Sequence, residues 1–137
     1  MTYKDFLESK IELATDSGFV VEPEHINKAL KPHQKDAVAW ALKGGRRALF
    51  ESFGLGKTVQ EIEFCHLAAE HENGRALIVL PLGVKQEFTR DAVEVLGYKE
   101  PEYCRTMEEV EQSKSQIVIT NYERVRDGDI RPEYFAA

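Results

Sequence analysis

The sequence has few of the residues that fix a fold through covalent or metal chemistry. Its 137 residues include two cysteines, Cys65 and Cys104, which make neither a disulfide framework nor the spacing of a zinc site. Cys65 lies near His66 and His71, but consecutive residues of a helix point in different directions, so we expect no metal site there. A chain of this length forms one domain, which must therefore be held by a hydrophobic core.

Long hydrophobic runs are also missing. The longest apolar run, residues 76–82, contains Pro81 and is far too short to cross a bilayer. Residues 1–6 lack the basic start and apolar centre of a signal peptide. We therefore expect no membrane partner and a cytoplasmic location.

Basic residues are fewer than acidic ones. The chain has 24 acidic and 18 basic residues, which gives a formal net charge of −6. This balance argues against a protein that holds nucleic acid by bulk charge alone. A local basic track, or one lined by backbone groups, remains compatible with it.

Hydrophobic periodicity, by contrast, is clear along the whole chain. Its first part predicts helices at 3–14, at about 24–30 and from Pro32 to Gly44-Gly45, with a short extended piece between the first two. After Gly45 the pattern alternates. It predicts strands at 47–50, 76–80, 102–105 and 117–120, and helices at 57–72, 84–96 and 107–112. The runs at 76–80 and 117–120 are typical of strands buried on both faces. Such alternation predicts a parallel sheet with helices on both faces.

A glycine-bearing turn, Gly54-Leu55-Gly56-Lys57-Thr58, separates the first predicted strand from its helix. Its glycines let successive backbone N–H groups point inward, its lysine reaches phosphates, and its threonine hydroxyl holds Mg²⁺. The helix N-terminus adds partial positive charge. The strict pattern expects a small residue where Glu51 stands, and a plain strand-to-helix turn is the alternative. We favour a phosphate loop because strand and helix flank the turn in the required order.

Three other segments accompany this loop. "LKPHQKDAVAWAL" precedes it, and "ALIVLPLGVKQEF" and "IVITNYERV" follow it. Taken alone, Gln34 of the first segment is better explained as a surface or capping residue. Together with "ESFGLGKTVQ", the segments resemble the first motor lobe of superfamily-two helicases of the DEAD/DEAH type. The resemblance is closest to the Swi/Snf-like branch of double-strand DNA translocases and its relatives in phages and mobile elements. It covers roughly residues 29–126.

The resemblance implies a fold and two ligands. The fold would be a three-layer α/β phosphate-loop (RecA-like) parallel sheet, incomplete at its C-terminus, over residues 29–137. Residues 1–28 would be a helical N-terminal extension. The ligands would be ATP with Mg²⁺, and DNA, expected to be duplex and held by its backbone.

The site residues carried over by position fall into two groups. Gln34 would recognise the adenine edge, Lys57 and Thr58 would be catalytic, and Thr58 would hold Mg²⁺. The remaining contacts to the nucleotide are assigned to Ser52, Phe53, Gly54, Leu55, Gly56 and Val59. The DNA contacts are assigned to Pro81, Gly83, Lys85, Thr120, Asn121 and Tyr122. Loops at the carboxyl ends of parallel strands suit such contacts, and backbone N–H groups can hold phosphates with little net charge.

One expected part of an ATP-driven motor is missing. Such a motor needs a strand ending in an acidic residue that positions Mg²⁺ and water. The predicted strands end instead in Pro81 and in Thr120-Asn121. The resemblance places the acidic strand and a second lobe beyond Ala137, in the rest of the motor polypeptide. We therefore expect the chain alone to bind nucleotide weakly, not to hydrolyse it, and to expose the edge of 117–119.

Two other functions are possible for a chain with a phosphate loop. A phosphate-loop kinase acting on a small metabolite would need a lid over the acceptor and an acidic strand end, and the sequence has neither. A nucleotide-binding module without turnover would keep the fold alone. Nucleotide affinity measured with and without DNA distinguishes these alternatives from a DNA-dependent ATPase.

Overall fold

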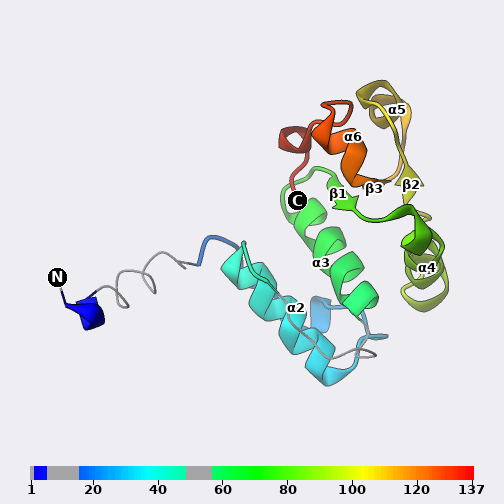
Figure 1. The fold of residues 1–137 in the computed structure, drawn as a ribbon. Helices are drawn as coiled ribbons and strands as arrows, with labels where there is room; N and C mark the ends of the chain where they lie inside the picture. The colour runs from blue at the N-terminus through cyan, green and yellow to red at the C-terminus, as the bar shows by residue number, and fades with distance from the viewer. Residues whose placement is uncertain (1, 6–15, 49–56) are drawn as a thin grey trace.

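The computed structural model describes residues 2–5, 16–48 and 57–137 (Figure 1). Of the helix predicted at 3–14, only the start is described, and residues 3–5 are helical. Of the strand predicted at 47–50, only residues 47–48 are described, and they belong to no strand. The named elements, in chain order, are η1 Pro23–His25, α2 Pro32–Gly44, α3 Lys57–His71, β1 Ala76–Val79, η2 Leu82–Val84, α4 Lys85–Arg90, η3 Asp91–Val95, β2 Glu102–Tyr103, α5 Met107–Gln112, β3 Ile117–Thr120, α6 Tyr122–Arg126 and η4 Pro132–Tyr134.

The three strands form a parallel sheet in the order β1-β3-β2. Ala76 of β1 pairs with Ile117 of β3, and Val79 with Thr120. β2 pairs with the other side of β3, where Glu102 lies opposite Val118. The predicted parallel sheet is thus confirmed. The expectation of an exposed edge at 117–119 was wrong, because β3 is flanked on both sides and all its residues are buried.

Helices cover both faces of this sheet, as predicted (Figure 1). On one face Ile78 and Ile119 share a core with α2, α3 and Phe88 of α4. On the other, Val118 packs with Val110 of α5 and Ile130 beyond α6. In the described ranges, no helix is both long and apolar enough to cross a membrane. The chain is therefore a mixed α/β protein built on a small parallel sheet.

The strand β1 departs from the prediction of burial on both faces. Ala76 and Ile78 are buried, whereas Leu77 is partly covered and Val79 is 44% exposed. The reason is that β1 lies at the edge of the sheet and its second face is only partly covered near its carboxyl end. Its outer edge is extended by the last two residues. Ala136 donates its N–H to the carbonyl of Arg75 (2.8 Å), and Leu77 donates to Ala137 (2.7 Å).

Helix boundaries follow the predicted signals in most places. Gly45 ends α2 with a positive φ of 79°, which glycine adopts without strain. The helix predicted at 24–30, however, is only the single turn η1. Asn27 uses its groups elsewhere: its N–H donates to Glu63 (2.6 Å) and its side-chain amide to the carbonyl of Leu96 (2.8 Å). Tertiary bonds thus replace a continued helix.

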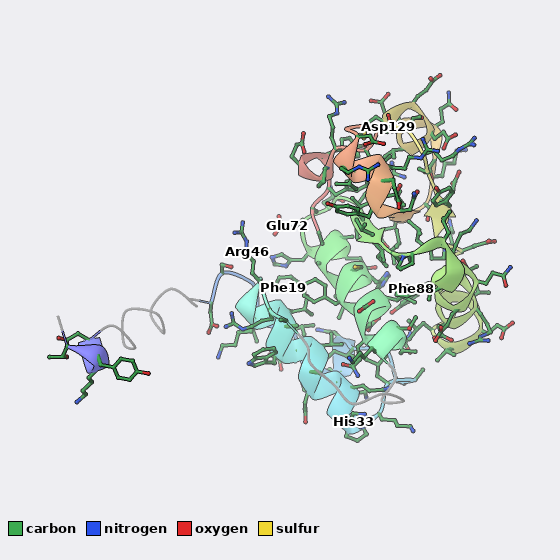
Figure 2. All side chains as sticks on the ribbon, in the orientation of Figure 1. Phe19, His33, Arg46, Glu72, Phe88 and Asp129 are labelled. Atoms are coloured by element: carbon green, nitrogen blue, oxygen red, sulfur yellow. The ribbon has the colours of Figure 1, made fainter. Side chains whose placement is uncertain are left out.

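Residues before α2 contribute to the core of the same lobe. The N–H groups of Ser17, Gly18 and Phe19 donate in turn to the carbonyls of Gly44, Lys43 and Leu42, at 2.9–3.1 Å. This strap, residues 17–19, satisfies carbonyls that a helix C-terminus otherwise leaves open. The Phe19 ring stacks on His71 of α3 at 3.7 Å. Figure 2 labels Phe19 and Arg46 near one end of α2 and His33 near the other.

A buried carboxylate joins three parts of the fold. Glu63 of α3 is fully buried, and it accepts hydrogen bonds from the backbone of Asn27 and from the hydroxyl of Tyr98. Burial, followed by the bond to Glu63, raises the pKa of Tyr98. His66, one turn later on α3, stacks on the Tyr98 ring at 4.0 Å. A carboxylate in this position depends on its donors, since burying a charge without them is costly.

We predict that Gly18→Ala destabilises the fold. A Cβ at this position would lie 1.6 Å from the carbonyl oxygen of Leu42, so the strap must move. The cost of such overpacking is about 1–3 kcal/mol. Urea unfolding followed by circular dichroism measures it. Gly83→Ala is the matched control, because a Cβ there meets nothing within 4 Å. Equal midpoints for the two variants would contradict the strap's role.

We also predict that Tyr98→Phe lowers the free energy of unfolding by about 1–3 kcal/mol, the usual cost of leaving a buried polar group without its partner. The change removes a donor to Glu63 and leaves the ring in place. Tyr3→Phe serves as the control, since Tyr3 is 76% exposed. Thermal and urea unfolding of both variants test this, and a stability unchanged by Tyr98→Phe would show that Glu63 does not need the hydroxyl.

Candidate functional site

Of the nucleotide-binding loop predicted from the sequence, the structure describes Lys57 and the residues after it. Lys57 is the first residue of the 15-residue helix α3, and it is exposed. Thr58 and Val59 follow in the first turn and are partly buried. The helix N-terminus provides N–H groups and partial positive charge at this point. The other assigned loop residues, Ser52, Phe53, Gly54, Leu55 and Gly56, lie outside the described residues, as does Glu51.

Gln34 occupies the first turn of α2 and is 7% exposed. Its Oε1 accepts the backbone N–H of Lys31 at 2.8 Å, which caps the start of the helix. The structure thus shows Gln34 in the capping role that the sequence alone favours. Its assignment to the adenine edge stays a prediction. In Figure 1, α2 and α3 both begin in the lower part of the view, so their first turns lie toward the same end of the lobe.

A cavity of about 350 Å³ lies between α2, α3 and β1. Its lining includes Glu61 and Cys65 of α3 and Val79 of β1. Partial burial raises the pKa of Glu61, and the ammonium of Lys57, one turn earlier, opposes this shift. Burial raises the pKa of Cys65 to about 12, with a further contribution from Glu61, so the thiol stays protonated. Glu61 does not follow a predicted strand, so the sequence pattern did not point to it. The spacing of Lys57 and Glu61, four apart on a helix, was the available signal.

The second predicted surface lies at the carboxyl ends of β1 and β3. Because Val79 pairs with Thr120 in a parallel register, the segments that follow both strands leave the same edge of the sheet. A groove of about 620 Å³ runs between these two segments. It is lined by Val79–Leu82 on one side and Asn121–Glu123 on the other. The structure thus brings together Pro81, Asn121 and Tyr122 from two distant parts of the sequence.

The remaining residues assigned to DNA lie in different surroundings. Gly83 is exposed in η2, and Lys85 is partly buried at the start of α4. Thr120 is fully buried, and its hydroxyl donates to the carbonyl of Cys104 at 2.8 Å. The Thr120 hydroxyl is therefore engaged inside the protein. It fixes the end of β3 beside the segment that follows β2.

One residue that the sequence analysis missed connects the two sides of this region. Tyr103 of β2 lies beneath Lys85, whose Nζ is 5.0 Å from the centre of the ring. Its hydroxyl donates to Oδ1 of Asn121 at 2.6 Å. Asn121 in turn donates through Nδ2 to Glu123 at 2.7 Å. Tyr103 belongs to a two-residue strand and to no recognisable motif. Its position next to Asn121 becomes apparent only from the order of the strands in the sheet.

The groove combines apolar surface with one negative charge. Leu82 is 53% exposed and Tyr122 is 64% exposed. A hydrogen bond from its own backbone N–H, then one from the Asn121 amide, lowers the pKa of Glu123, which therefore remains a carboxylate near neutral pH. This carboxylate already accepts the hydrogen bond that Nδ2 of Asn121 donates. The local charge at this end thus agrees with the acidic composition of the chain.

Comparisons with known proteins give no family to this chain: no family model and no curated protein matches it. Within the described residues, no three His, Cys, Asp or Glu side chains are grouped so that they could hold a metal ion. Both cysteines are free and buried. The function is therefore argued from the two ends of the sheet and from the motifs around them.

Proposed function

We propose that this chain is the ATP-binding portion of a DNA-dependent ATPase, either a helicase or a double-strand DNA translocase. The observation that carries the proposal is the parallel pairing of β1 and β3, with Val79 opposite Thr120. This pairing puts the two segments assigned to DNA on either side of one groove. The helix that begins with Lys57 packs against β1 of the same sheet. A nucleotide at α3 and DNA at the groove would then act on one rigid unit.

The nucleotide part of the proposal rests on the start of α3. Lys57 would bind the β- and γ-phosphates, and the Thr58 hydroxyl would hold Mg²⁺, with the glycine-bearing turn of 54–58 supplying backbone N–H groups. Gln34 would recognise adenine. The phosphate-loop, RecA-like form of the fold belongs to this proposal. The acid that positions water, and the arginine that reaches the γ-phosphate, would come from the rest of the motor polypeptide.

The DNA part rests on the groove and on Lys85. Phosphate contacts fix the position of a protein on DNA without reading its sequence, and backbone N–H groups and amides can supply them. An acidic chain with one lysine at this edge should release few counterions, so its binding should depend only modestly on salt. Exposed Tyr122 and Leu82 offer apolar surface to sugars or bases.

We predict that Lys57→Ala weakens ATP binding by roughly tenfold to a hundredfold, because a charge-assisted hydrogen bond to phosphate contributes about 1.5–3 kcal/mol. Lys57 is exposed, so its loss should leave the fold intact. Titration with a fluorescent ATP analogue, with and without Mg²⁺, measures the affinity. Lys114→Ala, an exposed lysine that precedes β3, is the control. Equal affinities of wild type and Lys57→Ala would rule out the phosphate loop.

A second prediction concerns the groove. Glu123→Gln should strengthen binding to duplex DNA by about twofold to fivefold at low salt, the effect of removing one exposed like charge. The amide keeps the size of the side chain and removes its charge, which weakens the hydrogen bond that Nδ2 of Asn121 donates to it. Fluorescence anisotropy with a labelled duplex provides the measurement. Glu111→Gln, an exposed residue of α5, is the matched control. If both variants bind equally, DNA does not approach Glu123.

A further inference from the structure

Tyr103 is placed where it can control two groups at once. It lies on β2 opposite Ile119, so the central strand of the sheet fixes its backbone. Its ring face meets the ammonium of Lys85 at 5.0 Å, and its hydroxyl donates to Asn121 at 2.6 Å. Lys85 is the first residue of α4, after β1, whereas Asn121 is the residue before α6, after β3. One partly buried side chain thus contacts both segments assigned to DNA.

The two contacts use different parts of the tyrosine. An ammonium over an aromatic face is attracted by the negative centre of the ring. This attraction restricts a long side chain that otherwise loses conformational entropy when it binds a partner, and such prior ordering strengthens binding. The hydroxyl, by donating to Oδ1 of Asn121, turns the other end of that amide, Nδ2, away from Tyr103. Nδ2 already donates to an anionic oxygen, that of Glu123.

A second cation extends the cluster. Arg124 donates to the Asp129 carboxylate at 3.3 Å. This bond, followed by the nearby Tyr103 hydroxyl, raises the pKa of Arg124. Two cations and one amide donor are arranged around a single residue. A phosphate oxygen needs donors of this kind, and it can replace the Glu123 carboxylate as the acceptor for Nδ2.

We propose that Tyr103 is a positioning residue for the DNA phosphate backbone, whose ring holds the ammonium of Lys85 and whose hydroxyl directs the Asn121 amide toward the same anion. The proposal rests on the DNA-binding function proposed above and deepens it. Tyr103 does not itself contact the phosphate. It sets the spacing between the Lys85 ammonium, in the segment after β1, and the Asn121 amide donor, in the segment after β3.

The test compares Tyr103→Phe, Tyr103→Leu and Lys85→Gln, alone and combined, in binding to a labelled duplex over a range of salt concentrations. Lys85→Gln should reduce the slope of log affinity against log salt by about one, as the loss of one phosphate contact does. Tyr103→Leu should lower the slope similarly, and adding Lys85→Gln to it should change little more. Tyr103→Phe keeps the ring, so it should retain the slope while losing about twofold to tenfold in affinity through the missing hydrogen bond.

A purely structural role would leave the slope unchanged, so the slope separates positioning from packing. Additive losses for Tyr103→Leu and Lys85→Gln would overturn the inference while leaving the proposed function in place. Wild type that fails to bind duplex would overturn the proposed function itself. The NMR shift of the Lys85 side-chain protons, moved by the ring in wild type and restored by Tyr103→Leu, reports the contact without DNA.

A second pair of variants covers the case in which Tyr103→Leu does not fold. Tyr103→Phe and Asn121→Ala both remove the hydroxyl-to-amide bond, and neither removes the ring. If the hydroxyl acts by directing Asn121, their effects on DNA affinity should be non-additive, with the double variant little weaker than Asn121→Ala alone. Additive losses would overturn this half of the inference. Thermal unfolding of each variant, with Tyr134→Phe as the control on a 49% exposed tyrosine, shows that the fold is retained.

Discussion

The parallel pairing of β1 with β3 is the constraint on which the rest of the structure depends. Its register sets Val79 against Thr120, and this alone determines that the two following segments meet at one edge. Burial of all four β3 residues makes the register costly to change, because a shift by one residue would exchange its two faces. The groove and the position of Asn121 follow from that pairing, and the pairing of β2 with the other side of β3 puts Tyr103 beside them.

Local signals in the sequence predicted most of the elements. Pro32, Gly45 and the apolar stripe between them were enough for α2, and Thr106 accepts the N–H of Glu109 as the cap of α5. Continuous β-branched residues were enough for β3. The predictions of these elements were correct because each element is determined by residues within a few positions of one another. The helix expected at 24–30 failed because distant groups, on α3 and at Leu96, take the hydrogen bonds of Asn27.

The candidate site was predictable in part, for the same reason. Lys57 begins a predicted helix and Asn121 follows a predicted strand, so both positions could be expected. The short helix α6 after Asn121 was not predicted. Tyr103 and Glu61 could not be found in this way. Tyr103 matters only because β2 lies next to β3, and strand order is not written in local periodicity. Thr120 shows the converse: a motif includes it, whereas its hydrogen bond to the backbone carbonyl of Cys104 decides where its hydroxyl points.

The strap at 17–19 shows that the N-terminal boundary of the lobe lies before the first motif. The motifs begin near residue 29, and a chain cut there would keep every residue assigned to ATP or DNA. It would also leave the carbonyls of Leu42, Lys43 and Gly44 without the donors that now cap α2. Ile26, which is 2% exposed, would leave the core together with the ring that stacks on His71. The contacts that stabilise the lobe therefore extend further toward the N-terminus than the motifs do.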